Sequence, residues 1–282
     1  MSQAKWDASR IPDQKGRVII VTGSTSGIGK ETARVLAKKN GTVILAVRNV
    51  EKGEGVAAEI RQEYPTADVA VRELDLSSLE SVSAFAKGIN RDYDRLDVLI
   101  NNAGIMMCPY STTQDGFEIQ MGTNHLGHFA LTGRLMPLLE KTEGSRIVAL
   151  SSGAHAMGNI DLTDLNWEER NYNTQRAYGD SKLANLYFTY ELARRLESNG
   201  NNPRVTAAHP GWTATDLQRH SGLMRFANLF FAQNVAMGAL PTLRAAFDED
   251  ANQGDFFGPE GMFHMRGYPV VQDSSERSHD GD

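Results

Sequence analysis

The stretch Gly23-Ser24-Thr25-Ser26-Gly27-Ile28-Gly29 follows the apolar run 18–21 and precedes a helical pattern that extends to Lys39. A strand, a glycine turn and a helix start in this order form a pocket for a pyrophosphate group. Backbone N–H groups at the start of a helix point at a bound anion, and glycines let the chain approach it closely. A strand-to-helix turn without any ligand would have the same pattern, because a glycine-rich turn alone is a weak signal.

The rest of the chain repeats this order of a short apolar run followed by a longer helical pattern. Strands are expected at 17–22, 42–47, 68–73, 97–101, 145–151 and 204–209, and helices at 27–39, 50–64, 78–91, 117–140 and 177–198. Most of the strand runs are dense in Val, Ile and Leu without alternation, as in strands buried on both faces. The pattern predicts a single doubly wound α/β domain of Rossmann type, with a central, mostly parallel sheet of about seven strands flanked by helices.

Composition limits the class of protein. The chain has 282 residues, 40% of them hydrophobic, which is enough for one large α/β domain. Its net charge of −6 argues against a nucleic-acid partner and a polybasic membrane patch. The single cysteine, Cys108, rules out an internal disulfide, and no apolar run reaches the length of a membrane span. The first 16 residues contain no apolar leader, so the expectation is a cytoplasmic enzyme.

Domain boundaries follow from the same composition. The domain is expected to span residues 14–270, after an N-terminal extension at 1–13. The tail 271–282 is polar, charged and rich in Ser and Asp, so it is predicted to be disordered. Residues 159–175 form a polar insertion with few apolar anchors besides Trp167, and this insertion is expected near the mouth of the active site.

The end of the second expected strand carries positive charge. Residues 45–50 contain no carboxylate, and Lys52 follows Arg48 and Asn49. A fold that prefers NAD usually places an acidic residue here to bind the ribose hydroxyls. A carboxylate would repel a 2′-phosphate, whereas a guanidinium binds it as a charge-assisted pair. These residues therefore favour NADP(H) over NAD(H), unless Arg48 is only solvated.

Two further turns are expected at the same edge of the sheet. Asp75 and Leu76 follow the third strand, and Asp75 either accepts a hydrogen bond from an adenine amino group or caps the helix that starts near Ser78. The stretch Asn101-Asn102-Ala103-Gly104 follows the fourth strand and is typical of a turn. Its small residues would let the adenosine ribose lie against the backbone.

A second motif, Tyr178-Gly179-Asp180-Ser181-Lys182, lies on the last expected helix. Positions i and i+4 share a helix face, so the phenol and the amine are neighbours. A phenol has a reference pKa near 10, and a nearby ammonium favours the phenolate and lowers that pKa. Tyr178 could then exchange a proton with a substrate oxygen, and Lys182 could hold the nicotinamide ribose. Tyr-x-x-x-Lys is common by chance, so the motif depends on its context.

Polar groups at the carboxyl edge of the sheet supply that context. Ser151 and Ser152 end the fifth strand, where a hydroxyl can orient a carbonyl. Asn124 lies within the expected helix 117–140, where an amide is usually surface filler but can hold a water that relays protons. The stretch Pro210-Gly211-Trp212-Thr213-Ala214-Thr215 follows the sixth strand, and its hydroxyls and backbone could clamp a carboxamide.

In this order, the motifs resemble those of the short-chain dehydrogenase/reductase family. They are Gly23-x-x-x-Gly27-x-Gly29, Asn101-Asn102-Ala103-Gly104, Asn124, Ser152, Tyr178-x-x-x-Lys182 and Pro210-Gly211-x-x-x-Thr215. The resemblance runs from about residue 16 to 247, and the ordered set is specific although no single motif is decisive. The stretches 45–53, 123–129 and 178–185 look most like the retinol-dehydrogenase-like group of the family.

The resemblance implies a role for each site residue. Tyr178 is the general acid for carbonyl reduction or the base for alcohol oxidation, Lys182 lowers its pKa and binds the nicotinamide ribose, Ser152 positions the carbonyl, and Asn124 anchors a relay water. Ser152 is preferred over Ser151 because the family's serine is usually the second of such a pair. Coenzyme contacts are expected from Gly23, Ser24, Thr25, Ser26, Gly27, Ile28, Gly29, Arg48, Asn49, Lys52, Asp75, Leu76, Asn102, Ala103, Gly104, Tyr178, Lys182, Pro210, Gly211, Thr213 and Thr215. No metal site is expected, because His125 and His128 have no Cys or acidic partner nearby in sequence.

Apolar side chains indicate the class of substrate. Met106, Met107 and Cys108, with a cluster after the sixth strand where the family carries a lid, favour an apolar carbonyl or alcohol. That cluster is Leu223, Met224, Phe226, Leu229, Phe230 and Phe231, and it could equally be core or a subunit contact. The helix 177–196 is apolar on most sides, which allows a homodimer or homotetramer. The expected function is hydride transfer between NADP(H) and such a substrate; the alternative is a non-catalytic NADP(H)-binding sensor or scaffold.

Overall fold

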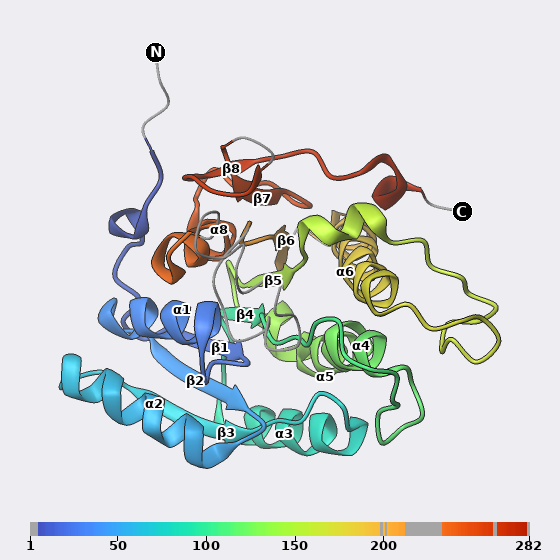
Figure 1. The fold of residues 1–282 in the computed structure, drawn as a ribbon. Helices are drawn as coiled ribbons and strands as arrows, with labels where there is room; N and C mark the ends of the chain where they lie inside the picture. The colour runs from blue at the N-terminus through green and yellow to red at the C-terminus, as the bar shows by residue number, and fades with distance from the viewer. Residues whose placement is uncertain (1–4, 198–199, 201, 212–232, 262–263, 281–282) are drawn as a thin grey trace.

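A single mixed sheet forms the centre of the molecule. The computed structural model describes residues 5–197, 200, 202–211, 233–261 and 264–280. Within these ranges, eight strands are ordered β3-β2-β1-β4-β5-β6-β7-β8, and all neighbouring pairs are parallel except β7–β8 (Figure 1). The strands are β1 (Val18–Thr22), β2 (Thr42–Val47), β3 (Val69–Glu73), β4 (Val98–Asn101), β5 (Arg146–Leu150), β6 (Arg204–Ala208), β7 (Phe256–Pro259) and β8 (Pro269–Val271). The six strands predicted from sequence are confirmed to within one residue at either end, and the sheet gains β7 and β8.

The helices follow the predicted pattern with one interruption and one addition. They are α1 (Gly27–Lys38), α2 (Val50–Glu63), α3 (Leu79–Asp92), α4 (Ile119–Met121), α5 (Gly127–Lys141), α6 (Thr174–Glu197) and α8 (Val235–Phe247), with the short helices η1 (Ala8–Arg10), η3 (Gly153–Met157) and η6 (Glu276–His279). The predicted helix 117–140 is instead interrupted between α4 and α5 by a π-helical turn, η2 (Gly122–Leu126). The sequence pattern did not predict α8.

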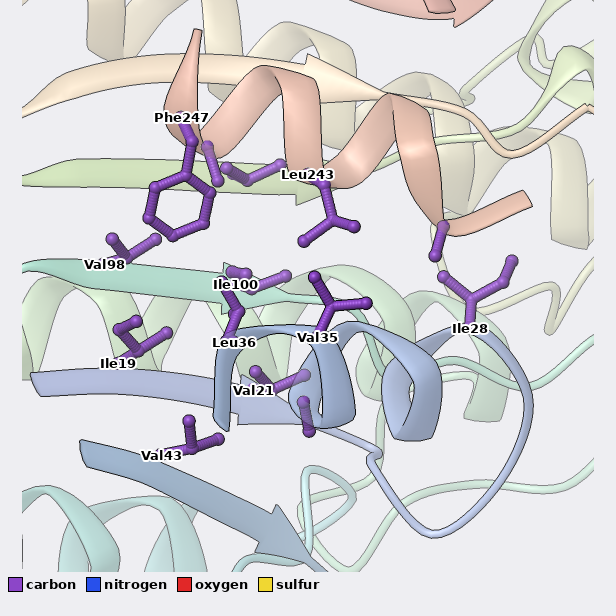
Figure 2. Packing of buried hydrophobic residues seen from close by; sticks show 14 of the residues in the cluster. Ile19, Val21, Ile28, Val35, Leu36, Val43, Val98, Ile100, Leu243 and Phe247 are labelled. Atoms are coloured by element: carbon purple, nitrogen blue, oxygen red, sulfur yellow. The ribbon is translucent and has the colours of Figure 1, made fainter. Parts of the chain in front are cut away.

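The helices cover the sheet in two layers. Side chains from α1, α2 and α8 pack on one face, together with Ile19, Val21 and Ile100 of the strands. Side chains from α3, α5 and α6 pack on the other face with the alternate strand residues, such as Ile20 and Leu99. Figure 2 shows the first layer, in which α1 and α8 lie over β1, β2 and β4. Burial on both faces explains why these strands are apolar without alternation.

The described residues near both ends of the chain, 5–13 and 271–280, are attached to the domain. In the N-terminal extension, Trp6 and Ile11 are buried in the first core layer. The tail predicted to be disordered contributes its first residue, Val271, to the edge strand β8 and then passes along α6 (Figure 1). There Arg277 donates to the carbonyl of Gly158 at 2.6 Å, and its own carbonyl accepts from the Tyr187 hydroxyl at 2.9 Å. Side-chain and backbone hydrogen bonds therefore hold this polar segment, which composition alone could not indicate.

Helix α6 uses much of its apolar surface inside the chain. Leu183 and Leu186 are fully buried, whereas Phe188 is half-buried and contacts the exposed Phe129 of α5 at 5.8 Å between ring centroids. Assembly into a homodimer or homotetramer stays a prediction.

Candidate active site

One cavity of about 470 Å³ lies at the carboxyl ends of β1, β2, β4 and β5. It brings together most of the residues that the sequence assigned to a coenzyme, from segments far apart in the chain. Its lining includes Gly23, Thr25, Ser26, Gly27, Ile28, Gly29, Arg48, Asn49, Lys52, Asp75, Leu76, Asn102, Ala103, Gly104, Tyr178, Lys182 and Pro210. Of the other predicted residues, Ser24, Asn124, Ser152 and Gly211 lie outside this lining, and Thr213 and Thr215 fall outside the described residues together with the predicted lid cluster.

The glycine loop is shaped for close approach of backbone segments. Gly23 has a φ of +67°, and a Cβ atom there would lie 2.8 Å from the Cα of Ala103. A Cβ atom on Gly29 would lie 2.4 Å from the Asn102 amide nitrogen and 2.6 Å from the Gly23 carbonyl oxygen. These two glycines therefore let β1, α1 and the 102–104 turn meet at one point.

The start of α1 is suited to an anion. Its N-cap residue, Ser26, makes no side-chain capping bond among the described residues, and the first turn contains no acidic residue. The N–H groups of an uncapped helix start are available to a bound phosphate, and the helix dipole favours negative charge there. Ser24 serves the loop instead, because it is fully buried and donates to the Val21 carbonyl at 3.2 Å.

The basic end of the cavity lies after β2. Arg48 and Lys52 are both exposed and line the cavity, and no ion pair of Arg48 occurs among the described residues. Asn49 caps α2, since its side chain accepts from the Lys52 N–H at 2.8 Å. This cap holds the start of α2, and with it Lys52, beside Arg48.

The two interpretations of Asp75 can now be separated. The N-cap of α3 is Ser78, so Asp75 is not the capping residue. Its carboxylate accepts instead from the N–H of Ser77 at 2.9 Å and from the Ser77 hydroxyl at 2.7 Å. Asp75 lines the cavity, and its contact with an adenine stays a prediction.

Tyr178 and Lys182 are neighbours on α6, as their spacing predicts. Both are buried, and the Lys182 Nζ lies over the Tyr178 ring, 5.7 Å from its centroid. The ammonium group donates to the Leu150 carbonyl at 3.1 Å, at the carboxyl end of β5. A Cβ atom on Gly104 would lie 3.4 Å from this Nζ, so the 102–104 turn passes directly beside it.

The electrostatics of this pair differ from the prediction. Burial raises the pKa of Tyr178 above its ordinary value near 10, and the hydrogen bond with the Ser152 hydroxyl only partly opposes that shift. Burial lowers the pKa of Lys182 to about 8. The net shift of the Tyr178 pKa is therefore upward, whereas the sequence predicts a lowered value, because the loss of solvent around the phenol outweighs the effect of the ammonium that lies over its ring.

The two serines after β5 have different partners. The Ser151 hydroxyl donates to the Lys182 carbonyl at 2.8 Å and so joins β5 to α6. The Ser152 side chain accepts from the Ala154 N–H at 3.2 Å and also bonds the Tyr178 phenol. Of the two candidate serines, Ser152 is therefore the one whose hydroxyl lies beside the Tyr178 phenol.

Asn124 lies in the π-helical turn, where its amide is used by protein groups. Its oxygen accepts from the Ile105 N–H at 2.8 Å, and its nitrogen donates to the Ile105 carbonyl and to the Ser181 hydroxyl, both at 2.9 Å. Gly127, the residue directly after this turn, packs closely on Leu76, since a Cβ atom there would lie 2.4 Å from the Leu76 carbonyl oxygen. A relay water held by Asn124 stays a prediction, and the structure adds a positioning role toward Ile105.

A buried network behind the cavity was not foreseen. The Thr22 hydroxyl accepts from the N–H groups of Asn102 and Ala103, both at 2.9 Å. It also bonds the Nε2 of His128 at 2.9 Å, while the His128 Nδ1 bonds the Asn124 carbonyl at 2.9 Å. The one feature of the sequence that could have indicated this network is Thr22, a hydroxyl residue at the end of an apolar strand and immediately before the glycine loop. His128 thus connects β1, the 102–104 turn and the π-helical turn.

The same network predicts instability in acid. Burial lowers the pKa of His128 from 6.5 to about 3, so the unfolded chain binds a proton below 6.5 that the folded chain excludes. Stability from this group is complete above pH 6.5 and is lost as the pH falls toward 3. At pH 4.5 the loss is about 2 to 3 kcal/mol, at about 1.4 kcal/mol per unit of pKa. Urea unfolding at pH 7.0 and 4.5 measures it.

Two variants check the assignment to His128. The His128→Asn variant should show a pH-dependent loss that is smaller by about 2 kcal/mol, because it removes the titrating group. The exposed His264→Gln variant should keep the full loss. Equal pH dependence in wild type and His128→Asn would contradict a buried neutral imidazole.

Comparison with known proteins agrees with this site. A sequence profile described as short chain dehydrogenase matches residues 17–225. Human retinol dehydrogenase 13 is 52% identical over 208 residues, which cover 74% of this chain and 62% of that protein. Human retinol dehydrogenase 11 is 49% identical over 237 residues, which cover 83% of this chain and 74% of that protein. The match to human retinol dehydrogenase 13 therefore spans less than two thirds of the length of that relative.

Solved structures show the same fold. The crystal structure of an uncharacterized protein from Mycobacterium paratuberculosis has a TM-score of 0.82 and 45% identity, covering 98% of this chain and 92% of that chain. A short chain dehydrogenase from Shigella flexneri complexed with NADP has a TM-score of 0.68 and 28% identity, covering 86% of this chain and 97% of that chain.

The chain belongs to the short-chain dehydrogenase/reductase family, within its retinol-dehydrogenase-like group. In the described part of the chain, no helix has both the length and the apolar character needed to span a membrane.

Proposed function

We propose that the protein transfers a hydride between NADP(H) and the carbonyl or alcohol group of an apolar small molecule, with Tyr178 as proton donor or acceptor. The observation that carries the proposal is one cavity that joins the basic Arg48 end to Tyr178 and Lys182. A nucleotide pocket alone would not need a buried phenol with a serine hydroxyl and an amine beside it. An epimerase or dehydratase of the same fold is disfavoured by the glycine spacing.

The residues present fit a dinucleotide phosphate. The uncapped start of α1 and the glycine loop suit the pyrophosphate, because the helix-start N–H groups are free of a side-chain cap among the described residues and Gly29 lets the loop pack closely against Asn102. Arg48 and Lys52 suit a 2′-phosphate, because both are cationic and exposed at the same end of the cavity. The Shigella flexneri relative complexed with NADP supports the same choice of coenzyme.

Bound NADPH would supply a hydride to the carbonyl carbon of the substrate. Tyr178 donates its proton to the carbonyl oxygen, which a raised pKa favours because the phenol stays protonated at neutral pH. The Ser152 hydroxyl orients that oxygen toward the phenol. Lys182 has a pKa of about 8, so it is largely cationic at pH 7 and stabilises the phenolate that remains. Oxidation of an alcohol runs through the same groups in reverse and needs the phenolate.

Part of the cavity suits an apolar substrate. Ile105, Met106 and Cys108 line the same cavity as Tyr178, and these side chains offer dispersion contacts and no charge. The human relatives are named retinol dehydrogenases, which supports a long apolar alcohol or its aldehyde. A screen of aldehydes, ketones and secondary alcohols that includes all-trans-retinal, followed by NADPH absorbance, tests the substrate class directly.

The choice of coenzyme gives a further prediction. The Arg48→Ala variant should lose about 30-fold or more in kcat/KM for NADPH, because a charge-assisted phosphate contact contributes about 2 kcal/mol or more. Its kcat/KM for NADH should change less than about threefold, since NADH carries no 2′-phosphate. Steady-state kinetics with both coenzymes measures the two losses. Arg134→Ala, at an exposed arginine of α5, serves as the control and should change neither value. A wild-type preference for NADH would overturn the coenzyme assignment.

A further inference from the structure

One wall of the cavity is a segment without regular secondary structure. Residues 105–108 follow the 102–104 turn, and Ile105, Met106 and Cys108 line the same cavity as Tyr178. Met107 has a φ of +51°, in the left-handed region that a side chain such as methionine rarely adopts. A strained conformation persists only where neighbouring groups fix it. The shape of this wall therefore depends on the groups that hold its backbone.

Two amide side chains from the α4–η2 segment hold that backbone. The Asn124 amide both donates to and accepts from Ile105, at 2.9 and 2.8 Å. The Gln120 oxygen accepts from the Met107 N–H at 2.7 Å. The two amides are four residues apart, and they form hydrogen bonds with alternate residues of the wall, Ile105 and Met107. Gln120 thereby fixes the left-handed residue that sets the directions of Met106 and Cys108.

Gln120 is fixed in turn by the insertion that precedes α6. Its amide nitrogen donates to the Tyr172 hydroxyl at 2.9 Å and to the Thr174 carbonyl at 3.1 Å. Thr174 is the first residue of α6, one turn before Tyr178. Gln120 has no exposed surface, so breaking these bonds would leave buried polar groups unpaired. The wall and the start of the helix that carries Tyr178 are therefore joined through one side chain.

A buried carboxylate completes the unit. The Tyr172 hydroxyl donates to Glu118 at 2.7 Å, and the same carboxylate accepts from the N–H groups of Gln120 at 2.9 Å and Met121 at 2.6 Å. Glu118 is fully buried. The Tyr172 ring also packs edge-on against Trp167, with 5.5 Å between ring centroids. Through Tyr172, the insertion is thus packed against the residues that hold the wall.

We propose that Gln120 and Tyr172, supported by Glu118, are positioning residues that set substrate selectivity by holding Met106 and Cys108 against the chain of a bound apolar substrate. The inference rests on the proposed function and assigns the insertion at 159–175 to the substrate site. A long apolar chain can bury more of its surface against this wall than a short one. Selectivity for long chains should therefore depend on Gln120 and Tyr172, and coenzyme affinity should not.

The test compares two aldehydes in two variants. Gln120→Leu removes the bond to Met107, and Tyr172→Phe removes only the hydroxyl that holds Gln120. We expect kcat/KM for decanal to fall about tenfold in each variant, while the value for butanal falls less than twofold and the Kd for NADPH stays within twofold. Gln14→Leu and Tyr187→Phe are the controls, because Gln14 is equally buried and the Tyr187 hydroxyl bonds the tail, both away from the wall.

A second readout does not depend on turnover. Cys108 is the only cysteine of the chain and belongs to the wall, so its rate of alkylation by N-ethylmaleimide reports how firmly the wall is held. This rate should rise about fivefold or more in both variants and in neither control. Should Gln120→Leu fail to fold, Tyr172→Phe still gives both measurements.

The outcomes separate the inference from the function on which it rests. A wild-type protein that oxidises NADPH with neither aldehyde nor any other carbonyl would overturn both. A wild type that reduces decanal and butanal, with an unchanged ratio of kcat/KM values in folded variants, would overturn the selectivity role alone, whatever the alkylation rate. A lower ratio together with faster alkylation supports the inference.

Discussion

Replacement of Tyr178 by Phe is expected to lower kcat for NADPH-dependent carbonyl reduction by about 10³-fold, within the range of general acid catalysis. The buried ring is kept, so the only groups lost are the hydroxyl and its bond to Ser152. The Kd for NADPH should stay within about threefold, because the phenol is assigned to the substrate oxygen. Single-turnover kinetics and fluorescence titration of NADPH measure the two quantities separately.

A tyrosine on the same helix provides the matched control. The Tyr187 hydroxyl of α6 donates to the Arg277 carbonyl, away from the cavity. Tyr187→Phe should keep kcat within about twofold of wild type and should show that loss of a tyrosine hydroxyl from α6 is tolerated. Turnover by Tyr178→Phe within tenfold of wild type would remove Tyr178 from the chemistry.

Replacement of Gly29 by Ala is expected to weaken NADPH binding by about 100-fold or more. The new Cβ atom would lie 2.4 Å from the Asn102 amide and 2.6 Å from the Gly23 carbonyl, and the second contact is with backbone. The loop and the 102–104 turn must separate to admit it, which moves the N–H groups of the α1 start that would bind the pyrophosphate. Isothermal titration with NADPH measures the loss.

The control for Gly29 is another helical glycine. A Cβ atom on Gly55 of α2 meets nothing within 4 Å. Alanine there should stabilise the fold by roughly 0.5 to 1 kcal/mol through helix propensity, without changing NADPH affinity. Gly29→Ala gains the same propensity, so a lower Tm in that variant would be due to the close contacts. NADPH binding by Gly29→Ala at wild-type affinity would contradict the placement of the coenzyme.

The sequence predicted elements where the local pattern is strong. The strands β1 to β6 are buried on both faces, so their runs of Val, Ile and Leu are uninterrupted and easy to read. The glycine spacing describes one turn between a strand and a helix, and the spacing of four positions from Tyr178 to Lys182 describes one turn of a helix. Such local geometry needs no information from distant residues, and the structure brings these groups into one cavity.

Elements that depend on distant neighbours were missed. β7 is four residues long and contains Gly258 and Pro259, which look like a turn in sequence. β8 is a strand only because it pairs with β7 at the edge of the sheet. Gly127, which directly follows the π-helical turn, allows a close approach to Leu76, some 50 residues earlier. Nothing in the periodicity of 117–140 could indicate that contact.

The chemistry of the site was predictable in kind but not in detail. Residue types predicted a phenol beside an amine, yet the direction of the Tyr178 pKa shift depends on burial that only the folded chain defines. Gln120 and His128 gave no usable signal, because a buried amide or imidazole that joins two segments is recognised only by its partners. The sequence therefore predicts most of the groups that line the cavity, but it does not indicate the buried side chains, such as Gln120 and His128, that hold the segments around it.

The most direct test of the account follows the hydride itself. Wild-type protein is incubated with NADPH deuterated at the C4 position of the nicotinamide and with an apolar aldehyde from the screen, and the alcohol product is analysed by mass spectrometry. When the deuterium occupies the C4 position from which the hydride is transferred, one deuterium is expected on the carbinol carbon of each product molecule. Tight binding of NADPH with no deuterated alcohol from any carbonyl tested would contradict it and would leave a protein that binds the nucleotide without catalysis.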